Sequence, residues 1–561
     1  MKKILAILLA LAMVLSLAAC GDNNANNGGT NTNNQTNNNT NTETDNTGKD
    51  TNTEQPTTTG EKVLNLATKS DGADDKVELP WQNLRMWTML MFRTLFTAEN
   101  DLTTVTPDLA SDYKVSDDGL TYTITVADGN KWSDGTPITA NDVAFSIKTN
   151  LKAAVSNGIY TNAFKKIVGS EAWRDGSATD LEGLKVNGNT ITMTLATAHR
   201  TMIPVLAQFI IIPEHILKDT DPLELQNNVE FWSNPVVSGP FKVTEWNTGN
   251  YFTMELNDQY TGQAPKITKV VVSFVSDYVT AAKDGKMDYY NTNSMVEIDE
   301  LSKVDGMTMY PVDILFYRYF IANIKGVDGN ENPVMADPKV REAILYAIDR
   351  ETIVKELFPN MGVVNNSGVV DSSSLFNGVK YEYNPEKAKQ LLQEANFDFN
   401  KTFRILYYHS DPTSVNFIET VVYYLEEIGM KVQATLSKQS TQDLFTTRDY
   451  DIGYKGLATF DSGEWYGEYN STNANFQNIF GGDTAFDQLI GKLDTSASEA
   501  ETADIYKQLQ KLENEKLYKL PIFTQGNNIF VNTNKVVLPE GLEFGHPWYK
   551  TNNRFAEWDI K

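Results

Sequence analysis

The alternation of apolar and polar residues predicts several β-strands in the first half of the chain. Residues 121–126 (TYTITV) alternate strictly between polar and apolar side chains, as a strand with one buried face does. Residues 241–246 and 251–257 are two further strand-like runs, and the sequence Asn-Thr-Gly-Asn between them is typical of a turn. We therefore expect these two runs to form a hairpin.

Later in the chain the apolar period changes from strand to helix and back. Residues 403–408 are strand-like, and residues 415–428 carry apolar side chains at helical spacing. Gly429 ends that helix, and residues 431–436 form a second strand. A strand, a helix and a strand within about 35 residues indicate a βαβ unit with parallel strands. The predicted fold class is α/β.

Three more helices are predicted from their first residues. Thr139 is a typical N-cap, and Asp142 stands at the position that completes a capping box. Asp337 and Asn384 are N-caps that each precede a proline, which is favourable in the first turn of a helix.

The first 20 residues have the layout of an export signal. Lys2 and Lys3 precede a near-continuous apolar run, residues 4–17, which is shorter than the roughly 20 residues of a spanning helix. Small residues then lead to Cys20, the only cysteine among 561 residues, which therefore has no partner for an intramolecular disulfide. Residues 1–19 are predicted to be a signal peptide.

Residues 17–20 (LAAC) resemble a bacterial lipobox. In a lipobox the cysteine thiol is alkylated by a diacylglyceryl group, and the chain is cut just before the cysteine. Two acyl chains are enough for lasting membrane attachment. The resemblance implies that Cys20 is the lipid anchor of an exported protein. The alternative is an ordinary secretory signal with an accidental cysteine.

The segment after Cys20 is polar throughout. Residues 21–62 contain no aromatic residue and no Val, Ile, Leu or Met. Such a segment cannot bury enough apolar surface to offset its chain entropy. We therefore expect residues 20–62 to comprise the lipidated cysteine and a disordered Asn- and Thr-rich linker. A flexible coil of about 40 residues spans roughly 35 Å, which holds a folded body clear of a membrane.

Length and charge limit what the rest of the chain can be. Residues 63–561 are too many for a single hydrophobic core and suit two or three domains. The formal net charge of −25 disfavours nucleic acid and anionic lipid as partners, because both require basic patches.

Known catalytic and metal-binding motifs are missing from the sequence. The four histidines, His199, His215, His409 and His546, are scattered and form no HExxH motif. Neither a G-x-S-x-G elbow nor a GxxxxGK phosphate loop occurs, and no glycosidase-like carboxylate pair is singled out. We therefore expect a binding protein that is not an enzyme and that has no cofactor and no metal site.

Residues 107–148 read PDLASDYKVSDDGLTYTITVADGNKWSDGTPITANDVAFSIK. The local pattern of these residues predicts a strand, two turns and a helix, which are structural elements with no exposed reactive group. The string nevertheless closely resembles the signature of the extracellular solute-binding proteins of family 5, the peptide-, nickel- and opine-binding group of ATP-binding-cassette (ABC) importers.

The resemblance continues in order along the chain from Val63 to the C-terminus. Four further segments are similar to segments of the family: 234–241 (NPVVSGPF), 283–288 (KDGKMD), 337–350 (DPKVREAILYAIDR) and 383–392 (YNPEKAKQLL). The resemblance to this family also accounts for Cys20, because bacteria without an outer membrane retain such receptors by a lipid anchor.

The family implies a fold in which two α/β lobes close over a ligand about a hinge, as in periplasmic binding proteins. Lobe I takes residues 63–94, 211–315 and 525–561, with an extra subdomain at residues 95–210. Lobe II takes residues 316–524.

The family also implies a function. The protein is expected to be a monomeric receptor on the outer face of the cytoplasmic membrane, in the periplasmic-equivalent space. It would capture a small solute and deliver it to the permease subunits of an ABC importer. A lipid-anchored sensor or chaperone is the alternative from another class, and an exported hydrolase is a third.

The ligand is expected to be a peptide, the most common cargo of the family. A non-peptide solute, such as an opine, a sugar or a nickel complex, is the alternative, and nickel is disfavoured by the small number of histidines.

The loop after residues 450–451 resembles the stretch in which peptide-binding relatives hold their cargo. Those relatives place an aspartate there to pair with the α-amino group of the peptide, because a buried ammonium needs a carboxylate. Asp461 stands one position later than the family pattern and is the implied partner; the alternative is a solvated turn residue. Four further residues are implied as ligand contacts: Trp465, Tyr454, Trp81 from lobe I and, at the far end of the ligand, Arg448.

Overall fold

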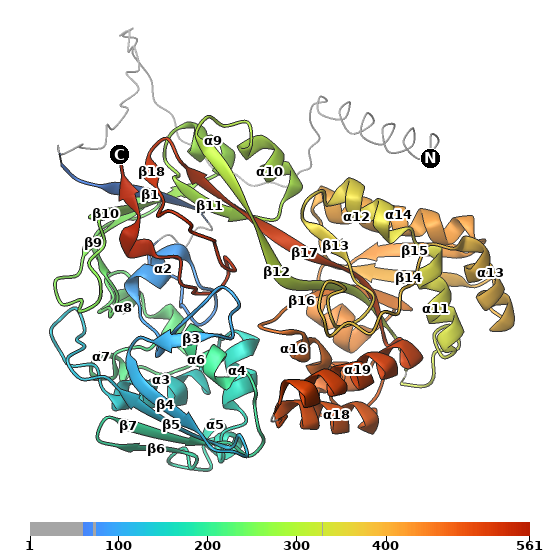
Figure 1. The fold of residues 1–561 in the computed structure, drawn as a ribbon, viewed down its shortest axis with the longest axis horizontal. Coiled ribbons are helices and arrows are strands. Elements are labelled where there is room, and N and C mark those ends of the chain that lie inside the picture. Colours follow the sequence, from blue (N-terminus) through green and yellow to red (C-terminus); the bar gives the residue numbers. More distant parts are fainter. Residues whose placement is uncertain (1–59, 71–74, 328, 497) are drawn as a thin grey trace, which may run out of the picture. The chain divides into compact units, whose positions relative to one another are not determined.

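The computed structural model describes residues 60–561, except for residues 71–74, 328 and 497 (Figure 1). The predicted signal peptide, Cys20 and most of the predicted linker lie outside the described residues. Among the described helices, none is long and apolar enough to cross a membrane. We use the predicted boundaries to name lobe I, its subdomain and lobe II.

Lobe I contains a four-stranded sheet with the order β1-β10-β9-β8. β1 (Val63–Lys69) and β10 (Lys269–Val275) are parallel, and β9 (Tyr251–Leu256) is antiparallel to β10 and to β8 (Phe241–Asn247). β8 and β9 form the predicted hairpin. Its turn contains Gly249 with a φ of +78°, a conformation that favours glycine.

The subdomain contains a second four-stranded sheet, which is antiparallel throughout. Its order is β4 (Ala110–Val115), β5 (Thr121–Val126), β7 (Thr190–Thr194) and β6 (Leu184–Asn187). β5 is the predicted alternating strand, and its apolar side chains are buried. The capping box of α3 (Ala140–Asn150) is also confirmed: Asn141 N donates to Thr139 Oγ1 at 3.2 Å, and Thr139 N donates to Asp142 Oδ2 at 2.8 Å.

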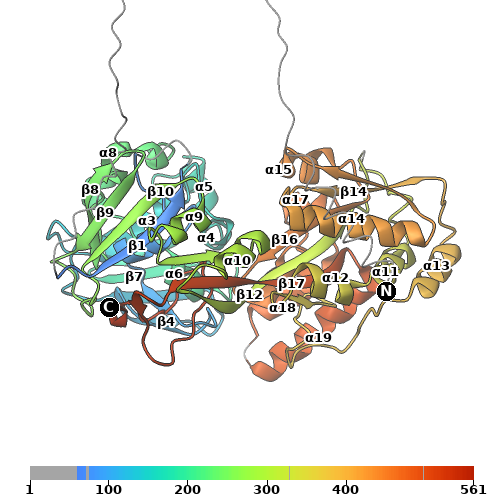
Figure 2. The ribbon, with the colours of Figure 1, turned by 90° about the horizontal axis from the view of Figure 1, so that it is seen from above.

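Two long strands, β12 (Met307–Ala322) and β17 (Lys519–Asn532), run antiparallel from lobe I into lobe II (Figures 1 and 2). They belong to a seven-stranded sheet with the order β11-β17-β12-β16-β14-β15, and a short strand, β13, pairs with β17. The β12–β17 register is irregular between Val312 and Phe316, where β12 enters lobe II. The other strands of this sheet are β11 (Tyr289–Thr292), β13 (Gly362–Val364), β14 (Thr402–Tyr407), β15 (Lys431–Leu436) and β16 (Ile452–Ala458).

β14, α14 (Pro412–Glu427) and β15 form the predicted βαβ unit, and the two strands are parallel. The helix begins at Pro412 rather than at residue 415, because Ser414 N donates to the side chain of Asp411 at 2.9 Å and caps the turn before the first apolar position. The predicted N-caps Asp337 and Asn384 are confirmed for α11 (Pro338–Ala347) and α13 (Pro385–Glu394).

The remaining elements connect and cover these sheets. The helices are α2 (Met86–Met91), α4 (Gly158–Phe164), α5 (Ser170–Arg174), α6 (Met202–Gln208), α7 (Glu214–Leu217), α8 (Val229–Trp232), α9 (Tyr278–Lys283), α10 (Met295–Leu301), α12 (Arg350–Leu357), α15 (Ser440–Gln442), α16 (Ser462–Gly467), α17 (Ala474–Gln477), α18 (Thr484–Asp494) and α19 (Glu499–Lys516). The short elements are η2 (Leu225–Asn227), η3 (Asp443–Thr447), η4 (Phe555–Glu557), β2 (Phe96–Ala98), β3 (Val105–Pro107), β18 (Val536–Val537) and β19 (Asp559–Ile560).

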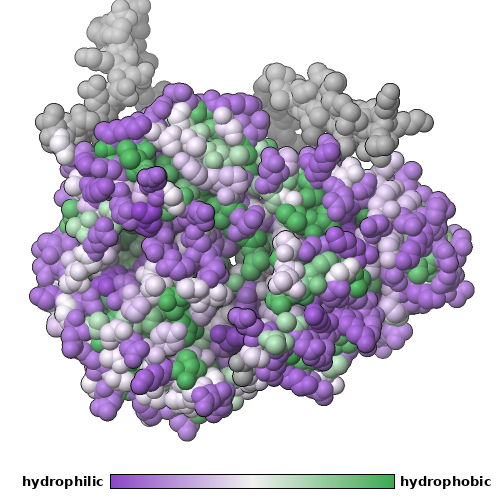
Figure 3. All heavy atoms as spheres, in the orientation of Figure 1, coloured by the Kyte–Doolittle hydropathy of each residue, from purple (hydrophilic) through white to green (hydrophobic). Residues whose placement is uncertain are grey.

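The sheet of lobe II has a hydrophobic core on each face, because successive side chains of β12 point in opposite directions. Phe320 joins one core together with residues of α14, whereas Tyr317 and Tyr319 join the other together with residues of α16, α18 and α19. Lobe I and its subdomain share a separate core. Hydrophilic residues cover most of the face shown in Figure 3, and smaller apolar patches lie among them.

Candidate functional site

Two neighbouring parallel strands of lobe II are followed by helices on opposite faces of the sheet. β14 and β16 pair in parallel. α14, after β14, packs into the core of Phe320, whereas α16, after β16, contributes Trp465 and Tyr466 to the other core. In α/β sheets, ligands bind outside the carboxyl ends of the strands at such a topological switch point. The segments that follow these strands, 408–411 and 459–461, are therefore the candidate site on lobe II.

Arg318 of β12 lies beside this switch point, opposite Gly456 of β16. Only 6% of the residue is exposed. Its Nε donates to Gln525 Oε1 at 3.0 Å, and its Nη1 lies 2.9 Å from Nε2 of His409. Burial, and then the neighbouring guanidinium, lower the pKa of His409 to about 4, so the ring is neutral at pH 7 and accepts this hydrogen bond.

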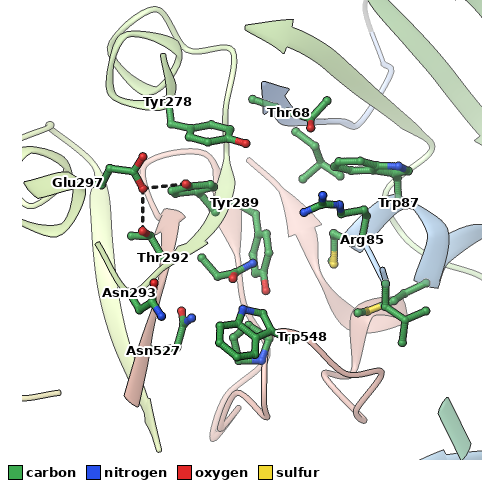
Figure 4. A pocket seen from close by; sticks show the side chains of 18 of the residues that line it. Thr68, Arg85, Trp87, Tyr278, Tyr289, Thr292, Asn293, Glu297, Asn527 and Trp548 are labelled. Carbon is green, nitrogen blue, oxygen red and sulfur yellow. Dashed lines mark hydrogen bonds between the residues drawn. The ribbon is translucent and has the colours of Figure 1, made fainter. Parts of the chain in front are cut away.

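Lobe I has a pocket of about 390 Å³ at the ends of β1 and β11 (Figure 4). Arg85 and Trp87 lie on one side of it, and Tyr278 and Glu297 lie on the other. Residues from β1, β11, β17 and the C-terminal segment complete the lining: Thr68, Tyr289, Thr292, Asn527 and Trp548.

Glu297 is the carboxylate of this pocket. It accepts hydrogen bonds from the hydroxyls of Tyr290 at 2.8 Å and Thr292 at 2.7 Å, and Lys69 Nζ lies 3.6 Å away. The Tyr278 and Tyr290 rings lie 4.2 Å apart. A concave surface with several aromatic rings and a few fixed polar groups is typical of a small-molecule site.

Aromatic contacts join the pocket to the switch point. Tyr549, which lines the pocket, packs on Phe460 of the segment that follows β16 with the ring centroids 4.9 Å apart. Trp548, which lines the pocket, packs edge-on against Phe316 of β12 with the ring centroids 5.3 Å apart. The guanidinium of Arg318 lies 4.1 Å from the centroid of the same Phe316 ring. The candidate surfaces of the two lobes are therefore neighbours.

Asp461 lies in the segment between β16 and α16, and its carboxylate is engaged. It accepts a hydrogen bond from Gly463 N at 2.7 Å as the N-cap of α16, and it forms an ion pair with Arg200 of the subdomain. The side chains of Asp461 and Arg200 are 16% and 32% exposed, so the pair is partly accessible to solvent.

A second contact to the subdomain lies beside that pair. Thr201 Oγ1 donates to Glu464 Oε1 at 2.7 Å, and Phe460 N donates to the other carboxylate oxygen at 3.3 Å. Burial, and then the negative charge of Asp461, raise the pKa of Glu464 to about 7. This carboxyl group therefore titrates near neutral pH.

The three aromatic residues predicted as cleft walls are core residues in this structure. Trp81 is fully buried, donates Nε1 to Ile210 O at 2.8 Å and stacks on Phe209. Tyr454 packs against Phe417 and Phe320, on the face opposite to Trp465. Trp465 packs on Tyr317 and donates Nε1 to Leu457 O at 3.2 Å, so it supports the loop of Asp461 from behind.

Arg448, the predicted contact for the far end of the ligand, lies at the opposite end of β16. Its guanidinium donates to the backbone carbonyls of Asn478 and Val327. The structure therefore brings Asp461 and Trp465 together and leaves Trp81, Tyr454 and Arg448 elsewhere. Arg318 was not predicted, although a charged residue inside the apolar run 314–322 (ILFYRYFIA) was the available signal.

Within the described residues, no group of three or more His, Cys, Asp and Glu side chains could hold a metal ion.

Residues 104–487 match the family described as bacterial extracellular solute-binding proteins, family 5 Middle. The chain belongs to this family.

Known relatives agree with this assignment. An ABC transporter peptide-binding protein of Brucella ovis is 27% identical over 353 residues, which are 62% of this chain and 63% of the relative, or less than two thirds of its length. The oligopeptide-binding protein OppA of Bacillus subtilis is 26% identical over 74% of this chain and 78% of its own length.

Solved structures have the same fold. The oligopeptide-binding protein AppA of Bacillus subtilis, in complex with a nonapeptide, superposes with a TM-score of 0.68 over 89% of this chain and 99% of that chain, at 22% identity. The predicted two-lobed α/β fold of periplasmic binding proteins is thus confirmed.

Proposed function

We propose that this protein is a solute-binding receptor that captures a peptide between lobe I and lobe II. Family membership supports the proposal, and so do the relatives, which include a peptide-binding protein and an AppA complex with a nonapeptide. The observation that carries it is the contact between Phe316 and Trp548, because it joins the switch-point edge of lobe II to the 390 Å³ pocket of lobe I.

Capture requires two arrangements of the lobes, of which the ligand binds one more tightly. β12 and β17 are the proposed hinge, and the irregular stretch between Val312 and Phe316 is where the strands can bend. The pocket then holds one part of the peptide, and the ends of β14 and β16 hold another. In this proposal the protein makes and breaks no covalent bond.

Asp461 is the proposed partner of the α-ammonium group of the peptide. Its carboxylate lies in the segment that follows β16 at the switch point and is partly exposed. Because Arg200 already pairs with it, the ammonium would share the carboxylate with the guanidinium or replace it. Trp465 would act indirectly, through its hydrogen bond to Leu457 O in the strand that leads to the loop.

We further propose that Cys20 carries a lipid anchor and that the loaded receptor delivers its ligand to the permease of an ABC importer. The lipobox-like sequence and the family support this proposal. Deleting the gene should abolish uptake of a labelled peptide that the purified protein binds. Unchanged uptake would contradict delivery, without contradicting binding.

Binding itself is tested by thermal unfolding and chromatography. A mixture of short peptides should raise the melting temperature, since a ligand at 100 times its Kd adds about 2.7 kcal/mol to the folded state. The peptides should be recovered intact. Hydrolysis by the pure protein would favour an enzyme, whereas a shift with sugars or with a nickel–histidine complex, and none with peptides, would favour a non-peptide receptor.

A further inference from the structure

The guanidinium of Arg318 is a buried charge that has no carboxylate partner among the described residues. Its two hydrogen-bond partners are the amide oxygen of Gln525 and the neutral ring of His409, and neither carries a negative charge. Burying a charge is costly unless an opposite charge compensates it. Within the chain, neutral acceptors can compensate instead, but only if they occupy the donors of the guanidinium. Arg318 has two such partners in the described part of the chain, so its remaining donors are open to a group from outside the chain.

A second buried arginine of lobe II, Arg350, has a guanidinium whose hydrogen-bond donors are occupied by the chain. Arg350 is 3% exposed and donates to four oxygens of the chain: Asn365 O, Pro521 O, Asn366 Oδ1 and Tyr381 O. Within the residues that the structure describes, Arg318 makes only two hydrogen bonds, one to the amide oxygen of Gln525 and one to a ring nitrogen of His409. Its Nη2 donates to none of the described residues, yet it is not enclosed by them. Arg318 thus keeps one edge of the guanidinium free.

The surroundings hold that edge in position. The rings of Phe316 and Tyr454 lie 4.1 and 5.7 Å from the guanidinium and stabilise it through cation–π contacts. Gly456 leaves room for it, because a Cβ there would lie 3.0 Å from Nη1. The 16-residue helix α14 begins just after His409, so the positive end of its dipole lies on the same side of the sheet.

We propose that Arg318 binds a carboxylate group of the ligand at the switch point of lobe II. The inference rests on the proposed function and specifies its ligand as an acid. A planar carboxylate fits the fork of a guanidinium, and the position next to Phe316 and Trp548 connects it to the pocket. For a peptide the group is the α-carboxylate, and an acidic side chain is the other source of the same chemistry.

Calorimetric titration of the full chain tests this with three probes: tetra-alanine, its C-terminal amide, and the amide of Ala-Ala-Ala-Glu. The wild type should bind the free acid roughly 10- to 100-fold more tightly than the tetra-alanine amide. Arg318→Gln should bind both alike. Arg554→Gln is the matched control, because Arg554 is partly exposed and pairs with Glu557 on the surface of lobe I. Tight binding of the Glu-containing amide would assign the site to an acidic side chain.

Each result separates this inference from the proposed function. If the wild type binds the tetra-alanine acid and amide and the Glu-containing amide equally, or if Arg318→Gln keeps the preference, Arg318 is structural and peptide binding stands. If Arg318→Gln does not fold, Arg318→Lys keeps the charge and should retain a weaker preference for the acid.

If the wild type binds no peptide, the peptide proposal fails, and native mass spectrometry of the purified protein decides about Arg318. A co-purified acid that is lost from the Arg318 variant supports the inference. A ligand without an acidic group, or equal retention by both proteins, overturns it.

Discussion

The carboxylate of Asp461 pairs with the guanidinium of Arg200, although the two residues are 261 positions apart in the chain. Arg200 belongs to the subdomain and Asp461 to the loop that follows β16, so this pair ties the subdomain to lobe II. Burial opposes the charge on Arg200, but Asp461 and other nearby acidic groups raise its pKa above the ordinary value. The same carboxylate caps α16.

We predict that Arg200 and Asp461 are energetically coupled. Arg200→Ala and Asp461→Asn should each lower stability in urea denaturation. The double variant should lose less than the sum, with a coupling of about 0.5–2 kcal/mol, as expected for partly exposed residues in contact. Lys303→Ala is the control, because Lys303 pairs with exposed carboxylates of the preceding helix, α10, and its effect should add to that of Asp461→Asn. Additivity of Arg200 and Asp461 would contradict a working ion pair.

The proposed role of Asp461 in binding predicts a preference for a free N-terminus. The wild type should bind a peptide more tightly than its N-acetylated form, and Asp461→Asn should lose that preference, by about 2–5 kcal/mol for a buried charge pair. Calorimetric titration measures both. Equal binding of the two peptides by the wild type would leave Asp461 with its structural roles alone.

The raised pKa of Glu464 leads us to predict that the stability of the protein depends on pH. Its pKa in the folded protein is about 7, above the 4.5 of an ordinary glutamate, so folding favours the protonated form. The stabilisation that Glu464 adds to the free energy of unfolding is complete below pH 4.5 and is lost as the pH rises through 7. The loss is at most about 1.4 kcal/mol per pH unit.

Melting temperatures of the wild type and Glu464→Gln between pH 5 and pH 8 measure this contribution. The wild type should lose stability toward pH 8 relative to the variant, which cannot ionise there. Parallel curves would show that Glu464 titrates normally.

Gly239 lies in the family-like segment 234–241, and we predict that adding a side chain at this position lowers the stability of the fold for steric reasons. A Cβ at this position would lie 2.7 Å from Met91 C and 2.8 Å from Met91 O, and backbone atoms cannot easily move away. Gly239→Ala should therefore destabilise the protein by about 1–3 kcal/mol.

Gly491→Ala is the matched control for Gly239→Ala. A Cβ at Gly491 of α18 would meet no atom within 4 Å. That substitution should stabilise the protein by about 0.5–1 kcal/mol through helix propensity. Similar denaturation midpoints for both variants would contradict the steric argument.

Cys20→Ala tests the proposed anchor. The variant should fold normally, because the residue precedes the folded body, and it should move from the membrane fraction into the medium. Immunoblotting of the two fractions after a high-salt wash measures this. Retention in the membrane fraction would exclude a thioether-linked lipid as the tether.

Much of the local structure could be predicted from the sequence because it depends on neighbouring residues. The alternation in β5 and the turn at Gly249 are set by side chains a few positions apart. N-caps such as Asp337 are equally local. The register of β12 with β17 depends on residues about 200 positions apart, and no short pattern contains it.

The candidate site was predictable only in part. The family-like loop that contains Asp461 was recognisable, but the strand β16 before it was not predicted. The pairing of Asp461 with Arg200 depends on the subdomain, which the motif does not include. Trp81 and Tyr454 show a second limit: an aromatic residue near a site packs equally well into a core, and periodicity does not distinguish the two. Arg318 could be interpreted only with the structure, because its proposed role depends on the guanidinium donors that its neighbours leave unpaired.

The sharing of β12 and β17 by both lobes also bears on how the molecule melts. Each strand contributes backbone hydrogen bonds in lobe I and in lobe II, so fraying of the pair in one lobe removes support from the sheet in the other. We therefore expect one cooperative calorimetric transition and slow amide hydrogen exchange along both strands. The two strands that we propose as the hinge are therefore also expected to make the lobes unfold together.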